Sequence, residues 1–189
     1  FNQIRQLKTT FLTKKMKKLT LTDIQVEDKK VLMRVDFNVP LKDGVITDDN
    51  RIVQALPSIN YVVEHGGLLI LTSHLGRPDG KPNVEFSLKA VADHLASLVD
   101  AKVHFATDCI GDEAKKVIEQ ADFGEIVLLE NVRFHKEETD NDEIFSGQLA
   151  SHADIFVNDA FGSSHRAHAS VAGVTKFMEQ SASGFLLEK

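Results

Sequence analysis

The stretch "LLILTSHLGRP", residues 68–78, decides the fold. It opens with four consecutive apolar residues and continues with a hydroxyl, a histidine and an arginine on a segment that contains glycine and proline. A short, wholly apolar run is typical of a parallel strand that is covered on both faces. Hydrogen-bond donors directly after such a strand are typical of a ligand-binding loop on a rigid scaffold. The stretch therefore predicts a buried strand followed by a binding loop.

The same arrangement recurs along the chain. Short apolar runs alternate with segments whose apolar residues are three, four and seven apart, as on one face of a helix. The chain has 189 residues, of which 42% are hydrophobic, which suits one packed domain. We expect an α/β fold, a doubly wound, Rossmann-like parallel sheet with helices on both faces. Pro57 in the first helical pattern predicts a kink or a late helix start. The runs lie at 31–33, 68–71, 103–106, 126–129 and 155–157, and the helical patterns at 52–63, 88–99, 114–121 and 145–153.

Charge is distributed unevenly. Residues 1–18 carry six basic side chains and no acidic one, so the rest of the chain has 16 basic and 28 acidic side chains, a net charge of −12. A body this acidic should repel nucleic acid and anionic lipid. No apolar stretch approaches the roughly 18 residues that a membrane span needs. We therefore expect neither a nucleic-acid nor a membrane partner. We interpret residues 1–16 as a basic leader, either an extension of the chain, a targeting-like segment or a disordered tail, and residues 17–189 as the folded domain.

Polar side chains gather after four of the five predicted strands, at 36–40, 73–78, 130–135 and 158–168. Ligands of open α/β sheets bind beyond the carboxyl ends of the strands. The chain has only six arginines, and Arg77, Arg133 and Arg166 lie on these loops, while Arg51 lies beside a predicted helix start. A guanidinium suits two-point capture of a carboxylate or a phosphate. The pattern predicts a site for a small, multiply charged anion. His74, His165 and His168 are candidates for further donors, with charges that change near neutral pH.

Several of these features also have ordinary structural interpretations. A single arginine after a strand is more often a surface ion-pair partner, but four on neighbouring loops favour a shared ligand. Asp36 and Asn38 could form an Asx turn ahead of Pro40. The segment "HKEETDNDE", residues 135–143, is interpreted as a solvated acidic loop that leads into a helix.

Metal and thiol chemistry are weakly indicated. The spacing of His165 and His168 could suit zinc, but third and fourth ligands are not obvious, so we expect no metal site. Cys109, the single cysteine, is interpreted as a half-buried side chain near a helix start, because no pairing with a histidine is evident. The segment 76–82 lacks the spacing and the hydroxyl of a nucleotide phosphate loop, so no cofactor site is expected in this chain.

Five stretches, taken in order, match one enzyme family: "RVDFNVP" (34–40), "DDNRI" (48–52), "SHLGRP" (73–78), "LLENVRFH" (128–135) and "NDAFGSSHRAHAS" (158–170). Over residues 17–189 the chain resembles the N-terminal, 3-phosphoglycerate-binding domain of the phosphoglycerate kinase family. The resemblance implies a glycolytic enzyme that transfers a phosphoryl group reversibly between 1,3-bisphosphoglycerate and ADP, giving 3-phosphoglycerate and ATP.

The resemblance also implies roles for particular residues. Asp36 and Asn38 match residues that hold the hydroxyl and carboxylate end of the substrate. Arg51 matches the catalytic residue that the family uses against charge on the transferring phosphoryl group. The basic cluster that binds the anion, notably its non-transferring phosphate, is matched by His74, Arg77, Arg133 and Arg166. The full set of expected substrate-binding residues is Asp36, Phe37, Asn38, Arg51, His74, Leu75, Gly76, Arg77, Arg133 and Arg166.

In the family, the nucleotide and its magnesium are bound by a second, C-terminal domain, which should follow Lys189. We therefore expect Mg-ATP or Mg-ADP to bind outside this chain and the fragment to be inactive alone. Family members are commonly monomeric and cytoplasmic, which sets the same expectation here. The alternatives are a non-catalytic, small-anion-binding α/β module and a receiver-like flavodoxin fold. The second should show paired aspartates at the first strand end, where Asp36 has no adjacent acid.

Overall fold

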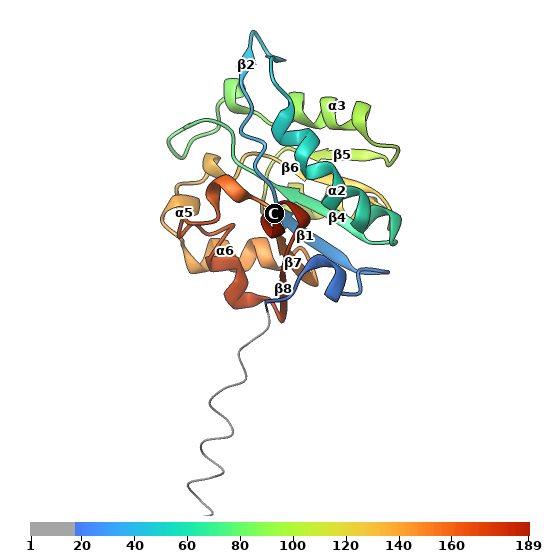
Figure 1. The fold of residues 1–189 in the computed structure, drawn as a ribbon. Coiled ribbons are helices and arrows are strands. Elements are labelled where there is room, and N and C mark those ends of the chain that lie inside the picture. Colours follow the sequence, from blue (N-terminus) through green and yellow to red (C-terminus); the bar gives the residue numbers. More distant parts are fainter. Residues whose placement is uncertain (1–17) are drawn as a thin grey trace, which may run out of the picture.

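Six parallel strands form the centre of the structure, a computed structural model that describes residues 18–189 (Figure 1). Their order across the sheet is β5-β6-β4-β1-β7-β8. Every neighbouring pair is parallel. Five of the six strands lie where the apolar runs predict strands. The predicted leader, residues 1–16, lies outside the described residues. The strands are β1 (Lys30–Arg34), β4 (Leu68–Thr72), β5 (Val103–Ala106), β6 (Ile126–Leu129), β7 (Ile155–Asn158) and β8 (Gln180–Ser183).

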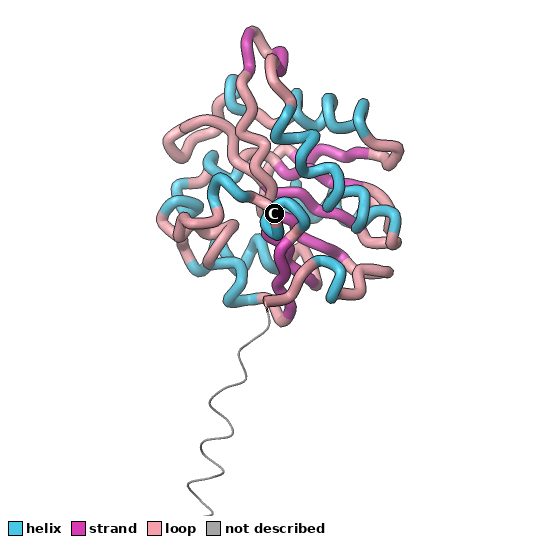
Figure 2. Tube along the Cα trace, in the orientation of Figure 1, coloured by secondary structure: helices cyan, strands magenta, loops and turns pink. Residues whose placement is uncertain are grey.

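Helices cover both faces of the six-stranded sheet, whose strands are magenta in Figure 2. Successive strand residues point to opposite faces. Met33 and Leu71 pack with the helices α2 and α3 on one face, while Leu32 and Ile70 pack with α4 and α6 on the other. This confirms the predicted doubly wound α/β fold. The helices are α2 (Asn50–Glu64), α3 (Lys89–Leu98), α4 (Gly111–Gln120), α5 (Lys136–Thr139), α6 (Glu143–Ala150) and α7 (Phe185–Glu188).

Burial on both faces makes the central strand sensitive to lost volume. Ile70 in β4 is fully buried. We expect Ile70→Ala to lower the free energy of unfolding by roughly 2–5 kcal/mol, because it removes apolar contacts and leaves a cavity. Urea denaturation at pH 7 measures this change. Val84→Ala is the control, since Val84 is 88% exposed and should change the value by less than about 0.5 kcal/mol. A loss under about 1 kcal/mol for Ile70→Ala would contradict this account of the core.

Three elements differ from the sequence-based expectation. Helix α2 runs from Asn50 across Pro57 to Glu64, so the predicted late start is wrong. A hairpin of β2 (Leu41–Lys42) and β3 (Val45–Ile46) was not predicted. It turns at Asp43 and Gly44, whose φ values of 52° and 77° suit the tight hairpin turn that an Asp-Gly pair favours. Strand β8 reads "QSAS", which has no apolar run and therefore no strand signal.

The direction of the connections changes at β1, which pairs with β4 on one side and with β7 on the other. In open α/β sheets, ligands bind beyond the carboxyl ends of the strands at such a switch point, in the crevice between the loops that follow them. Three of the four polar clusters, at 36–40, 73–78 and 158–168, follow β1, β4 and β7. Across residues 18–189, no helix has both the length and the apolar character that a membrane crossing demands.

Candidate anion-binding site

Three arginines from distant parts of the chain line one cavity of about 440 Å³. Arg77 follows β4, Arg133 lies in the one-turn 3-10 helix Val132–Phe134 after β6, and Arg166 follows β7. Lys136 also lines the cavity, as does one acidic residue, Asp79. Arg133 is 9% exposed, whereas Arg77 and Arg166 are exposed. The cavity therefore concentrates positive charge at the carboxyl ends of the strands.

Two buried nitrogen atoms at this cavity, Arg133 Nε and His168 Nδ1, have no hydrogen-bond partner within residues 18–189. Burial and the neighbouring charge of Arg166 lower the pKa of Arg133. Burial, followed by the charge of Arg133, lowers the pKa of His168. Buried polar atoms without partners are rare and costly. A bound anion would accept a hydrogen bond from the Arg133 guanidinium and offset the repulsion between the cations.

Arg51 lies at a neighbouring, smaller cavity of about 160 Å³, which Asp36 and Gly162 also line. It is in the first turn of α2, and its Nη1 atom contacts both carboxylate oxygens of Asp36 at 2.9 Å. The side chain of Arg51 is 51% exposed. The sequence predicted convergence of all four arginines. The structure instead gathers three of them around one cavity and holds Arg51 beside them on Asp36.

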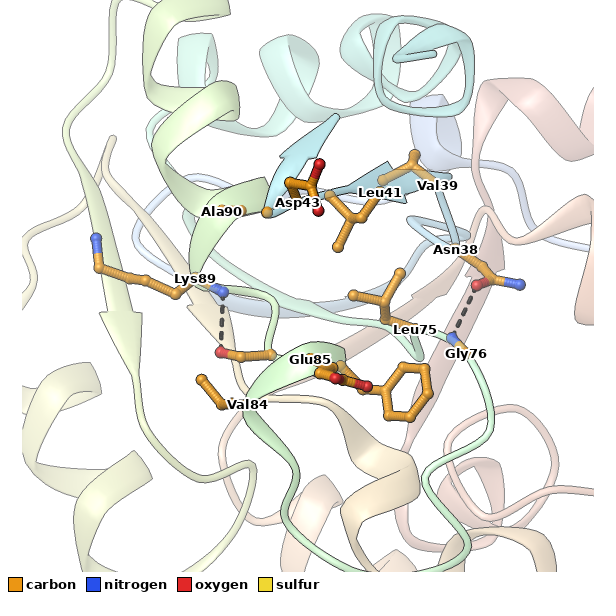
Figure 3. Close-up of a pocket in the computed structure, with 13 residues that line it drawn as sticks. Asn38, Val39, Leu41, Asp43, Leu75, Gly76, Val84, Glu85, Lys89 and Ala90 are labelled. Atoms are coloured by element: carbon orange, nitrogen blue, oxygen red, sulfur yellow. Dashed lines mark hydrogen bonds between the residues drawn. The ribbon is translucent and has the colours of Figure 1, made fainter. Parts of the chain in front are cut away.

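A chain of hydrogen bonds connects the two cavities. Asp36 Oδ1 accepts a hydrogen bond from the backbone N–H of Asn38 at 3.1 Å, which is the predicted Asx turn. Asn38 Oδ1 accepts one from Gly76 N at 2.9 Å (Figure 3). The carbonyl of Gly76 accepts one from Arg133 Nη1 at 3.1 Å. Gly76 has φ +61°, and a Cβ there would lie 2.4 Å from the Phe86 ring, so glycine is required. The polar loops thus form one connected unit.

Phe37 and Leu75 direct their side chains into the protein rather than towards the arginines. Phe37 is fully buried, Leu75 is 3% exposed, and both belong to the core. The backbone N–H of Phe37 donates to Ser73 Oγ at 2.9 Å, and the carbonyl of Leu75 accepts from Asn131 Nδ2 at 2.7 Å. Leu75 also lines a separate cavity of about 540 Å³ with Asn38 and Gly76 (Figure 3). These two residues anchor the binding loops to the core.

The three histidines of the predicted site have different environments. His74 is 6% exposed, and burial, followed by the charge of Arg34, lowers its pKa to about 2. The prediction that its charge changes near neutral pH is therefore wrong, because it is neutral there. His168 lines the arginine cavity, whereas His165 lines a different cavity beside Phe161. His165 and His168, whose spacing in the sequence could suit zinc, therefore line two different cavities.

Two charged residues were not among the predicted site residues. Arg34 and Glu138 are both 0% exposed. Glu138 belongs to the segment 135–143, so the interpretation of that segment as a solvated loop is wrong at this position. The carboxylate is buried because it accepts hydrogen bonds from the backbone and the hydroxyl of Ser170. The sequence does contain a signal that Arg34 is buried, because this arginine lies inside the apolar stretch "VLMRV", residues 31–35.

Asp108, Cys109 and His135 come together after β5 and β6, with potential metal-ligand atoms within 4.8 Å of one another. His135 Nε2 lies 2.8 Å from Asp108 Oδ1. Cys109 is fully buried, not half-buried as predicted, and burial raises the pKa of its thiol. Two of the three groups, His135 and Asp108, are already hydrogen-bonded to each other. The cluster thus contains an ion pair beside a buried thiol.

This ion pair makes stability depend on pH. The hydrogen bond to Asp108 raises the pKa of His135, which stabilises the fold below pH 6.5 and is lost as the pH rises through the folded-state pKa. Although burial opposes it, the hydrogen bond from His135 lowers the pKa of Asp108, which stabilises the fold above pH 3.8. We expect the coupling between the residues to be larger at pH 5.5 than at pH 8.5. Urea denaturation of Asp108→Asn, His135→Asn and the double variant measures it. Equal coupling at both pH values would contradict the assignment.

Comparison with known proteins identifies the family. A family model described as phosphoglycerate kinase matches residues 21–189. The curated phosphoglycerate kinases of Chloroherpeton thalassium and Clostridium novyi are 56% and 54% identical to this chain. The matches cover 92% and 93% of this chain but 44% of each relative, so the chain spans less than half the length of these relatives.

Solved structures agree with the sequence relatives. The phosphoglycerate kinase of Coxiella burnetii has a TM-score of 0.80 at 37% identity, over 90% of this chain and 42% of that one. The enzyme of Pyrococcus horikoshii has a TM-score of 0.81 at 32% identity, over 90% and 43%. The matched region includes every strand of the sheet and all of the arginines of the site. The chain therefore belongs to the phosphoglycerate kinase family.

Proposed function

We propose that this chain binds 3-phosphoglycerate and supplies the acid half of the site of a phosphoglycerate kinase. The reaction is the reversible transfer of a phosphoryl group between 1,3-bisphosphoglycerate and ADP in glycolysis. The observation that carries the proposal is the convergence of Arg77, Arg133 and Arg166 on one cavity, where Arg133 Nε is a buried donor without a partner among the described residues. Family membership supports it.

The geometry suggests how the substrate is divided between the two cavities. The non-transferring phosphate occupies the arginine cavity, where Arg133 Nε gains an acceptor. Asp36 and Asn38, on the loop between the cavities, hold the hydroxyl and carboxylate end. Arg51, at the smaller cavity, faces the phosphoryl group that moves.

In phosphoryl transfer the protein contributes mainly by positioning the reactants and neutralising charge, and little by forming covalent bonds itself. The substrate carboxylate attacks the terminal phosphorus of ATP in line, the bond from that phosphorus to the bridging oxygen breaks, and ADP leaves. Negative charge spreads over the moving group. Fixed positive charge on Arg51 stabilises that charge, while the arginine cavity holds the substrate in place. His74 is neutral at physiological pH and serves as a hydrogen-bond donor, not as an acid.

Mg-ATP or Mg-ADP is the co-substrate of this reaction. We place its binding in the part of the relatives' length that these 189 residues do not span. Residues 17–189 are then a 3-phosphoglycerate-binding domain that binds the acid but does not turn over alone. We expect the protein to be monomeric and to act in the cytoplasm, where glycolysis takes place.

Calorimetric titration of the 189-residue chain tests the proposal. 3-Phosphoglycerate should bind at least roughly tenfold more tightly than glycerate, since it adds a phosphate that several arginines can pair with. Binding should weaken with added salt. Equal affinity for the two acids would contradict the proposed phosphate cavity. A non-catalytic anion module would also bind the acid, and it would be distinguished by absent turnover in the full-length protein.

A further inference from the structure

A fully buried guanidinium lies beneath the proposed anion site. Arg34 is the last residue of β1, and its side chain is 0% exposed. Its Nε donates to Ser170 Oγ at 2.8 Å, its Nη2 lies 2.8 Å from His74 Nδ1, and its Nη1 donates to the Val35 carbonyl. Because all three nitrogens have partners and the side chain is fully buried, Arg34 does not touch a ligand itself.

The direction of each hydrogen bond in this cluster follows from chemistry. A guanidinium has donors and no acceptor. The Ser170 hydroxyl therefore accepts from Arg34 and gives its own hydrogen to Glu138 Oε1, at 2.5 Å. Glu138 Oε2 accepts from the backbone N–H of Ser170 at 2.9 Å. Glu138 and Ser170 are both fully buried, so the carboxylate and Ser170 hold the guanidinium in one orientation.

The same reasoning settles the state of the His74 ring. Its Nδ1 atom faces a group that only donates, so Nδ1 must be an unprotonated acceptor. A neutral imidazole carries one hydrogen, which is then on Nε2. Protonation of both nitrogens would bring a second cation against Arg34, with Arg133 and Arg166 nearby.

We propose that Arg34 is a positioning residue, held by Ser170 and Glu138, that fixes His74 as the tautomer with its proton on Nε2. The ring then keeps one neutral donor, Nε2–H, close to Arg133 and Arg166 without adding a charge to them. The identity of the bound anion rests on the proposed function, whereas the tautomer does not. An arginine that served only as the counter-charge of Glu138 would leave the tautomer of His74 unconstrained.

Two-bond ¹H–¹⁵N NMR of the ligand-free, 189-residue chain tests the tautomer directly. The His74 signals are assigned by their loss in His74→Asn. Between pH 6 and 8 we expect Nε2 protonated and Nδ1 unprotonated. His152 and His65 are internal references for the two tautomers, because His152 Nε2 and His65 Nδ1 bond carbonyl oxygens. A wild-type ring protonated on Nδ1 would overturn the proposal.

Arg34→Met tests the cause. It removes the donor to Nδ1, so we expect a mixed or Nδ1-protonated ring. An unchanged Nε2 tautomer would overturn the assignment to Arg34. The variant leaves Glu138 buried without its cation, which can prevent folding. Arg34→Met/Glu138→Gln removes both charges and is measured in the same way. If neither variant folds, the wild-type spectrum decides.

Binding measurements test whether Arg34 acts through His74. By calorimetry, Arg34→Met should weaken 3-phosphoglycerate binding by roughly 10- to 100-fold, the size of one strong hydrogen bond to a charged ligand. In a His74→Ala background the further loss should be under about threefold. Multiplying losses would overturn the proposal. Lys116→Met is the control, because it also replaces a cation by methionine but at an exposed position, and it should leave the affinity for 3-phosphoglycerate unchanged. If the wild-type chain fails to bind the acid, the proposed function fails while the tautomer result stands.

Discussion

Replacing Arg51 with methionine is expected to lower kcat of the full-length protein by roughly 1,000-fold, with KM for 3-phosphoglycerate changed less than about threefold. Arg51 lies outside the cavity that three other arginines line, and it is held on Asp36 by two contacts of 2.9 Å. It therefore adds little to ground-state binding in the proposed arrangement. In the proposed function its charge acts on the moving phosphoryl group, whose negative charge develops in the transition state.

Steady-state kinetics with both substrates measures this effect. Arg51→Lys is the matched control, since it keeps the charge but loses the planar pair of donors, and it should recover part of the rate. A kcat of Arg51→Met near that of the wild type would show that Arg51 is not catalytic. A roughly 1,000-fold rise in KM with unchanged kcat would instead show that Arg51 contributes to binding of the substrate in the ground state.

Replacing Arg133 with methionine should weaken 3-phosphoglycerate binding by roughly 100- to 1,000-fold. Arg133 is the most buried of the three arginines at the cavity, and its Nε has no partner among the described residues. Its Nη1 also holds the carbonyl of Gly76, which connects the loop after β6 to the loop after β4. The variant thus loses the proposed ligand contact and a hydrogen bond that links two loops.

Calorimetry measures the change, and thermal unfolding checks that the fold persists. Arg77→Met is the matched comparison, because Arg77 lines the same cavity but is exposed, and solvent weakens its pairing. We expect a loss of only roughly tenfold there. If Arg133→Met bound the acid within threefold of the wild type, the arginine cavity would not be the phosphate site.

Much of the fold was predictable because its signals are local. A strand covered on both faces must be apolar at every position, so the runs at 68–71 and 126–129 predicted β4 and β6 without knowledge of their neighbours. The edge strand β8 lacked such a run, because its pairing with β7 uses backbone groups and its side chains are small or polar. The Asp43-Gly44 turn was readable in principle from its dipeptide.

The sequence by itself determined the doubly wound sheet and placed three arginines on loops that follow its strands. This was possible because parallel strands end at one edge, so residues directly after them must gather there. Only the tertiary structure decided which arginines share a cavity, and that His74 is neutral beside Arg34. Those outcomes depend on burial and on partners such as Ser170, 136 positions from Arg34, and a local pattern carries no record of such distant contacts.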